Sequence, residues 1–164
     1  MSIVFVNIGS NLGNRRLNLS RAIRAIGEEF GEYEISHVVE SEPWGFDSTH
    51  SFLNVCVMFR SDLAPLDILH RLQAIERGIS PASHRNPDGT YADRIIDIDI
   101  VAIDVIREGK PELLVMDTPE LTLPHPRLKE RDFFLRPLLE LAPAVIERLL
   151  GRGTQTCKMI SSRP

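Results

Sequence analysis

The stretch at residues 95–104, IIDIDIVAID, constrains the fold of this chain more than any other part of the sequence. Isoleucines alternate with aspartates over residues 96–100, which is typical of a β-strand with one face in the core. Because successive side chains on a strand point to opposite faces, Asp97 and Asp99 share a face, with their Cα atoms about 6.7 Å apart. The opposite face, which we expect to pack against helices, carries Ile96, Ile98, Ile100 and Ala102.

Two carboxylates this close repel one another unless a cation lies between them. Hard oxygen ligands on a rigid strand suit Mg²⁺, which keeps most of its waters and takes one or two carboxylates together with substrate phosphates. A solvent-facing strand that simply carries charges is the alternative interpretation. An Asp-x-Asp pattern by itself does not decide between the two.

Basic residues near this strand favour the metal interpretation. Arg94 precedes the strand, and the run HPRLKER at 125–131 adds cations near the expected start of a helix. Guanidinium groups bind phosphate oxygens with paired hydrogen bonds, and imidazole can donate to the same oxygens. Acids for a metal and bases for phosphates together indicate nucleotide chemistry. A solvated helix face for 127–131, and a structural cap after Pro124 for His125, remain the alternatives.

The rest of the sequence predicts an alternation of strands and helices. A run of β-forming residues that ends in a Gly-Ser-Asn turn predicts a strand at 2–8, and apolar residues at helical spacing predict a helix at 14–28. The further expected elements are strands at 33–40 and 52–60, a helix at 65–76, a long loop at 77–94, the acidic strand, a short apolar run near 113–116 and a helix at 132–141.

The order strand, helix, strand, strand, helix, strand is the split β-α-β pattern of ferredoxin-like α+β folds. We therefore predict an antiparallel sheet with helices on one face and an open face for a ligand. A length of 164 residues suits one domain over 1–164, with a weakly ordered tail after about residue 151.

Composition and charge exclude several classes of protein. A hydrophobic fraction of 43% and a charged fraction of 26% are those of an ordinary globular protein. The formal charge of −4 gives no global basic field, so we expect no nucleic-acid partner. There is no long apolar run and no signal-peptide pattern, and Cys56 and Cys157 form neither a zinc nor a disulfide pattern. We expect a cytoplasmic monomer without a membrane partner.

Five motifs occur together and in order. They are GSNLG at 9–13, EPWG at 42–45, FLN at 52–54, DRIIDIDI at 93–100 and LPHPRLKERDFFLRPLLELAP at 123–143. In this combination the chain resembles the 6-hydroxymethyl-7,8-dihydropterin pyrophosphokinase family, over residues 3 to about 145. The resemblance implies transfer of a diphosphate from ATP to the hydroxymethyl group of the pterin, with release of AMP, in folate biosynthesis.

The resemblance also implies roles for individual residues. Asp97 and Asp99 match an acidic pair that holds two Mg²⁺ ions bridging the phosphates of ATP. For the pterin it implies stacking between Phe52 and Phe133 and reading of the ring edge by the amide of Asn54. The 41–45 loop completes the pocket, so that the implied pterin contacts are Trp44, Gly45, Phe52, Asn54, Phe133 and Asp97. Both stacking residues, Phe52 and Phe133, could instead be core residues at strand and helix spacing.

For ATP, the resemblance implies contacts on both the nucleoside side and the phosphate side. Glu76 matches a position near adenine and ribose. The full implied set is Glu76, Tyr91, Arg94, Ile100, His125 and Arg131. Transfer of a diphosphate needs positioning and charge neutralisation more than a protein nucleophile. The residues expected to act on the phosphates are Arg94, His125, Arg131 and a loop cation, Arg85.

The loop at 77–94 departs from the family's pattern. Many members carry GR-x-R soon after the glutamate and RWGPR before the acidic strand, whereas Tyr91 here takes the usual Trp place and Asp93 the usual Pro place. Arg85, beside His84, is our candidate to replace a lid arginine in a loop that closes over ATP. Glu120 stands where some members have a basic residue.

Two other functions fit parts of the sequence. A two-metal nucleotidyltransferase also combines a Gly-Ser turn with Asp-x-Asp, but there the turn lies close before the acids, whereas Gly9 and Ser10 lie far upstream. A non-catalytic ferredoxin-like binding module would use the open sheet face, but it gives no reason for two acids in the middle of the sheet. Release of AMP would indicate the pyrophosphokinase, whereas release of pyrophosphate would indicate the nucleotidyltransferase.

Overall fold

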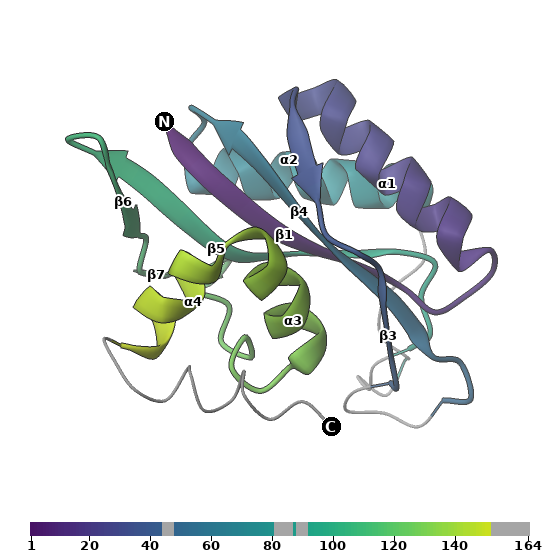
Figure 1. The fold of residues 1–164 in the computed structure, drawn as a ribbon. Coiled ribbons are helices and arrows are strands. Elements are labelled where there is room, and N and C mark those ends of the chain that lie inside the picture. The colour runs from purple at the N-terminus through teal and green to yellow at the C-terminus, as the bar shows by residue number, and fades with distance from the viewer. Residues whose placement is uncertain (44–47, 81–86, 88–91, 152–164) are drawn as a thin grey trace.

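The computed structural model describes residues 1–43, 48–80, 87 and 92–151. Figure 1 shows how these residues build a sheet with helices on either side. In chain order the elements are β1 (Ser2–Ser10), α1 (Arg15–Phe30), β2 (Tyr33–Ile35), β3 (Val39–Ser41), β4 (Phe52–Ser61), α2 (Pro65–Ile79), β5 (Asp97–Arg107), β6 (Lys110–Leu113), β7 (Met116–Asp117), β8 (Thr122–Leu123), α3 (Asp132–Leu141) and α4 (Pro143–Leu150). No helix among the described residues is long and apolar enough to cross a membrane.

The main sheet has the strand order β2-β4-β1-β5-β6, and β3 pairs with β4 beside it. Each of these pairings is antiparallel. The long strands β4, β1 and β5 lie next to one another in the middle, so the acidic strand is bonded directly to the N-terminal strand. The predicted α+β class with an antiparallel sheet is confirmed.

Local sequence signals explain where α1 and α2 begin. Gly13 adopts a positive φ of 69°, a conformation that suits glycine, and the turn then brings Asn14 to the start of α1. The Asn14 side chain caps the helix by accepting a hydrogen bond from the N–H of Leu17 at 3.1 Å. Pro65 occupies the first turn of α2, where its missing N–H costs nothing.

Helices cover both faces of the sheet, which corrects the prediction that they lie on one face. On one side, the core joins Val4, Val6 and Ile8 of β1 to apolar residues of α1 and α2. On the other side, Phe5 of β1 and Cys56 of β4 pack with apolar residues of α3 and α4. The sequence provides four apolar positions that need burial on this second side, Phe134, Leu138, Val145 and Ile146. The helix α4, which the patterns did not predict, is also tied to β5 by an ion pair between Arg148 and the buried Asp104.

A β-bulge changes the phase of β5 halfway along. Val6 pairs with Ile100, but the preceding Phe5 pairs with Ala102, so Val101 is the extra residue. Ile98 and Ile100 therefore lie in the core with α1 and α2, whereas Ala102 lies in the core with α3 and α4. The prediction that Ala102 shares a face with the isoleucines was wrong, because strict alternation fails across a bulge.

The predicted strand at 33–40 is two short strands, β2 and β3, with Ser36 between them. The Ser36 hydroxyl accepts the N–H of Cys56 at 2.9 Å, and the Ser36 N–H donates to the Cys56 carbonyl at 3.0 Å. The side chain thus replaces one backbone bond of the ladder and interrupts the regular pairing. The helix predicted at 65–76 continues to Ile79.

Candidate active site

Strand pairing brings polar residues from three strands onto one face. Gly9 of β1 lies opposite both Asn54 of β4 and Asp97 of β5. One row further along, Asn7 lies opposite Asp99. Since Phe5, two positions before Asn7, belongs to the core with α3 and α4, this polar face adjoins the part of the sheet that those helices cover. The shared face predicted for the two aspartates is present.

Asp97 and Asp99 are half-buried, and their charges interact. Burial raises the pKa of Asp99 well above its usual value, and the neighbouring Asp97 carboxylate raises it further, against the opposing charges of Arg131 and Arg94. The guanidinium of Arg94 donates to Asp97 at 2.8 Å. Among the described residues, no group of three or more His, Cys, Asp or Glu side chains could hold a metal ion. A cation bound by this pair would therefore need further oxygen ligands from water or a substrate.

A cavity of about 340 Å³ lies beside β5, between α2 and the segment that contains β8. Its lining includes five residues that sequence analysis singled out for metal or nucleotide: Glu76, Asp97, Asp99, Ile100 and His125. These residues come from positions as far apart as 76 and 125 in the chain. The cavity is thus the place where the fold unites most of the predicted nucleotide-binding residues that the structure describes.

Glu76 at the end of α2 contacts the backbone of the acidic strand. Its carboxylate accepts the N–H of Ile98 at 2.7 Å. Burial, followed by the charge of Asp97, raises the pKa of Glu76 to about 7. The carboxyl group therefore exchanges its proton near neutral pH, beside the two aspartates.

Glu76→Gln is expected to flatten the pH dependence of stability. A folded-state pKa raised from 4.5 to about 7 means that the folded protein holds a proton which the unfolded chain has released, so stability falls as pH rises through this window. Glutamine keeps the hydrogen-bond acceptor for Ile98 without titrating. Thermal unfolding at pH 5 and pH 8 tests this: the variant should lose less of its melting temperature than the wild type. An equal loss in both proteins would contradict the raised pKa.

His125 combines a structural contact with a place in the cavity. The ring atom Nδ1 accepts the backbone N–H of Arg127 at 3.0 Å, and the backbone N–H of His125 donates to the Val101 carbonyl at 2.9 Å. The ring also packs edge-to-face on Phe134, with 5.0 Å between centroids. Burial and the charge of Arg131 lower the pKa of His125 to about 4, so the ring is neutral at pH 7. Because Nδ1 accepts, Nε2 carries the proton and is a hydrogen-bond donor.

The arginines predicted to contact phosphates also pack against the predicted stacking residues. The Arg94 guanidinium lies 5.7 Å from the centroid of the Phe52 ring, and the Arg131 guanidinium lies 5.6 Å from that of Phe133. Phe133 contacts Phe134 edge-to-face, at 4.9 Å between centroids. Each cation–π contact restrains both the ring and the cation.

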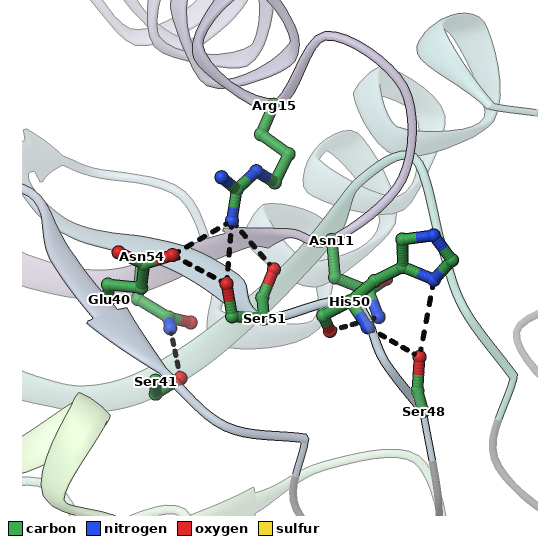
Figure 2. A network of polar contacts seen from close by, with 8 residues as sticks. All are labelled: Asn11, Arg15, Glu40, Ser41, Ser48, His50, Ser51 and Asn54. Atoms are coloured by element: carbon green, nitrogen blue, oxygen red, sulfur yellow. Dashed lines mark hydrogen bonds and ion pairs between the residues drawn. The ribbon is translucent and has the colours of Figure 1, made fainter.

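A network that the sequence did not reveal fixes the start of β4, as Figure 2 shows. Arg15 Nη1 donates to the carbonyl and the hydroxyl of Ser51, both at 2.9 Å, and lies 3.2 Å from Glu40 Oε1. The Ser51 hydroxyl donates to the same Glu40 oxygen at 2.5 Å. These bonds, first that from Ser51 and then that from Arg15, lower the pKa of Glu40. The network ties α1 and β3 to the residue directly before Phe52.

Asn11, also missed as an individual site residue, joins two segments that carry predicted residues. It is 1% exposed, accepts the N–H of Arg94 at 2.8 Å and donates to Asp93 at 2.7 Å and to the His50 carbonyl at 3.3 Å. The His50 ring completes the group through a contact of 3.1 Å with Asp93. The only sequence signal was the position of Asn11 inside the GSNLG motif.

Several predictions fall on residues outside those that the structure describes. They concern Trp44, Gly45, Arg85, Tyr91, the closure of the loop at 77–94 and the tail after residue 151. Glu120 is described: it lines the cavity, and its carboxylate lies 2.9 Å from His70 Nε2. The His70 imidazole therefore faces Glu120, at the position where some proteins of the resembled family have a basic residue.

Known proteins resemble this chain over most of its length. The model of the family described as 7,8-dihydro-6-hydroxymethylpterin-pyrophosphokinase (HPPK) matches residues 5–143. A 2-amino-4-hydroxy-6-hydroxymethyldihydropteridine pyrophosphokinase of Porphyromonas gingivalis is 44% identical over 144 residues, which cover 87% of this chain and 92% of that protein. The Aquifex aeolicus protein of the same name is 38% identical over 159 residues, 96% of this chain and 91% of that protein.

The fold is also similar to that of solved structures. The structure titled HPPK-DHPS in complex with substrates matches with a TM-score of 0.61 at 15% identity, over 87% of this chain and 40% of that longer chain. A Plasmodium falciparum HPPK-DHPS matches with a TM-score of 0.58 at 13% identity, over 85% of this chain and 40% of that chain. At these identities the likeness concerns the fold alone.

Proposed function

Because the chain belongs to the 7,8-dihydro-6-hydroxymethylpterin-pyrophosphokinase family and is a pyrophosphokinase of folate biosynthesis, we propose that Asp97 and Asp99 are the centre of its diphosphate transfer from ATP to 6-hydroxymethyl-7,8-dihydropterin. The observation that carries this assignment is the cavity beside β5, which both aspartates line together with Glu76 and His125. Neither the nucleotidyltransferase nor the non-catalytic binding module is favoured by the family membership.

The donor set fits Mg²⁺. Asp97 and Asp99 offer hard oxygen ligands. Burial, followed by repulsion from Asp97, raises the pKa of Asp99, and a cation would relieve that repulsion. We infer two Mg²⁺ ions, held by these two carboxylates and by the phosphates of ATP. When bound, they supply neutralisation of phosphate charge and a lower pKa for the attacking hydroxyl.

The protein's own groups bind and orient the phosphates. The neutral His125 ring donates from Nε2, and Arg94 and Arg131 provide positive charge that also acts on Asp99. In the reaction, the hydroxymethyl oxygen forms a bond to the β-phosphorus of ATP while the bond between that phosphorus and the oxygen of AMP breaks. No protein nucleophile is required. In this proposal Glu76 and Ile100, which both line the cavity, contact the nucleoside part.

The pterin, in this proposal, lies between Phe52 and Phe133 and is read along its edge by Asn54. Two observations support the location. The amide of Asn54 lies in the same row of the sheet as Asp97, and the two arginines proposed for the phosphates each pack on one of the two aromatic rings. Trp44, Gly45, Arg85 and Tyr91, outside the described residues, keep the roles that the family resemblance implies.

We further infer a cytoplasmic monomer without nucleic-acid or membrane partners. The co-substrate ATP is an intracellular metabolite, and the formal charge of −4 does not favour binding to nucleic acid. Size-exclusion chromatography with light scattering would test the monomer.

The experiment that tests the function is to mix the protein with ATP, Mg²⁺ and 6-hydroxymethyl-7,8-dihydropterin and to identify the released adenine nucleotide by chromatography. We expect AMP that depends on the pterin and is lost in Asp97→Ala and Asp99→Ala. Asp62→Asn, an exposed acid at the far end of β4, is the matched control and should retain activity. Release of ADP or of pyrophosphate would contradict the proposal.

Gly9→Ala is expected to raise the KM for the pterin on the order of tenfold, with a stability loss of about 1–3 kcal/mol. A Cβ atom at Gly9 would lie 2.9 Å from Asn54 Oδ1, so the amide proposed to read the pterin edge would have to move, whereas the distance of 3.5 Å to the Phe52 ring is an ordinary contact. Gly78→Ala on α2 is the control, because its Cβ meets nothing within 4 Å. An unchanged pterin KM in Gly9→Ala would argue against this location of the pocket.

A further inference from the structure

Asn7 is a buried amide in the middle of β1, at a position where the pattern of the strand favours an apolar side chain. It shares its face with Phe5 and is 4% exposed. Cys56 of β4 lies opposite it on one side and Asp99 of β5 on the other. Asn7 thus lies between the strand proposed to bind the pterin and the strand proposed to bind the metal.

The amide of Asn7 holds the amide of Asn54. Asn7 Nδ2 donates to Asn54 Oδ1 at 3.3 Å. Asn54 Nδ2 in turn donates to the hydroxyl of Ser41 at 2.8 Å, and Figure 2 shows this second bond. A serine hydroxyl both donates and accepts, so Ser41 alone does not select one orientation of the amide. The bond from Asn7 adds a second, differently directed restraint. One lone pair and one N–H of Asn54 remain for a ligand.

The second polar atom of Asn7 does not contribute to stability. Its Oδ1 is buried and has no hydrogen-bond partner among the described residues. A buried polar atom without a partner costs free energy, so the Oδ1 half of this amide is unfavourable for the fold. Residues that are unfavourable for the fold are often found at functional sites.

We propose that Asn7 is a positioning residue for the pterin: its N–H fixes the Asn54 amide in the orientation that pairs with the N–H and C=O groups along the edge of the heterocycle. This inference rests on the proposed function, because it requires Asn54 to contact the pterin. It assigns to Asn7 a role in selecting which ring edge the site accepts, without contact to the ATP phosphates.

Asn7→Val tests the role and separates it from packing. Valine suits a buried strand and removes the unpartnered Oδ1, which offsets part of the cost of leaving Asn54 Oδ1 without its donor, so this variant should lose less stability than Asn7→Ala. In both variants the KM for the pterin should rise about tenfold, with kcat and the KM for ATP within about twofold. A merely structural residue would instead raise the KM in step with the loss of stability, and so more in Asn7→Ala than in Asn7→Val.

Cys56→Ala is the matched control. Cys56 is buried in the same row and on the same face, and burial raises the pKa of its thiol to about 12, so it is chemically inert at neutral pH. Its truncation should lower stability and leave the KM for the pterin unchanged. If Cys56→Ala raised that KM as much as Asn7→Ala does, the effect would be one of packing and the proposal would be wrong.

A double-mutant cycle with Asn54→Ala completes the test. If Asn7 acts through Asn54, Asn7→Val in the Asn54→Ala background should not raise the pterin KM further. Additive effects, or an unchanged pterin KM in Asn7→Val, would overturn the role of Asn7 and leave the proposed function intact. Absence of pterin-dependent AMP from the wild type would instead overturn the proposed function itself.

Discussion

Asp99→Asn should stabilise the protein at neutral pH while lowering kcat/KM by on the order of 10²–10³, the loss typical of one electrostatic contact to a reacting group. The folded-state pKa of Asp99 is raised by burial and by Asp97. Between the usual and the raised pKa, the folded protein binds more protons than the unfolded chain, so its stability falls as pH increases. Asparagine removes this penalty, but it also removes a negatively charged ligand for the metal.

Thermal unfolding with and without Mg²⁺ separates the two effects. At pH 8, without Mg²⁺, the variant should melt above the wild type. Addition of Mg²⁺ and ATP should raise the melting temperature of the wild type more than that of the variant, because ligand that binds only the folded protein stabilises it. Asp117→Asn, on an exposed residue of β7, is the control and should change neither quantity. Wild-type activity in Asp99→Asn would contradict the metal site.

Arg94→Ala should lower kcat/KM on the order of 10²-fold or more, and should also lower stability by about 1–3 kcal/mol. The Arg94 side chain is 10% exposed, donates to Asp97 at 2.8 Å and lies over the Phe52 ring. Its removal leaves the charge of Asp97 without this partner, beside Asp99. The substitution therefore affects the proposed phosphate contact and the support of the proposed pterin pocket at once.

Arg94→Lys distinguishes charge from geometry. Lysine keeps the charge but not the planar fork that binds two oxygens and stacks on an aromatic ring, so we expect it to recover stability better than activity. Steady-state kinetics with either substrate varied, together with urea unfolding, would measure both quantities. Arg107→Ala, at the opposite end of β5 and exposed, is the matched control. Full activity in Arg94→Ala would exclude Arg94 from the reaction.

The sequence predicted most of the elements because their signals are local. The period of two at 95–104 and the helical spacing at 14–28 and 65–76 depend only on neighbouring residues. The shared face of Asp97 and Asp99 follows from the same period, since it holds within any regular strand. The pattern failed first where the chain departs from regularity, at the bulge at Val101 and at the break between β2 and β3.

The site residues also divide into those that the sequence identified and those that only distant contacts reveal. The aspartates, Ile100 and His125 were predicted because they lie in motifs, and Glu76 because it matches a position of the family; the structure places all of them around one cavity. The motifs gave no individual role to the residues that support the site, because their partners lie far along the chain. Asn11 bonds to residues 82 and 83 positions away, Asn7 to one 47 positions away, and Arg15 to one 36 positions away.

By itself, therefore, the sequence determined the α+β class, the two acids on one face and the family to which the chain belongs. Only the tertiary structure decided that α3 and α4 cover the second face, that Val101 is the extra residue of a bulge and that Asn7 holds the amide of Asn54. The physical reason is the distance along the chain over which each kind of interaction acts. Backbone preference and hydrophobic period act over a few residues, whereas strand order and side-chain hydrogen bonds join segments whose separation along the chain carries no information about their distance in space.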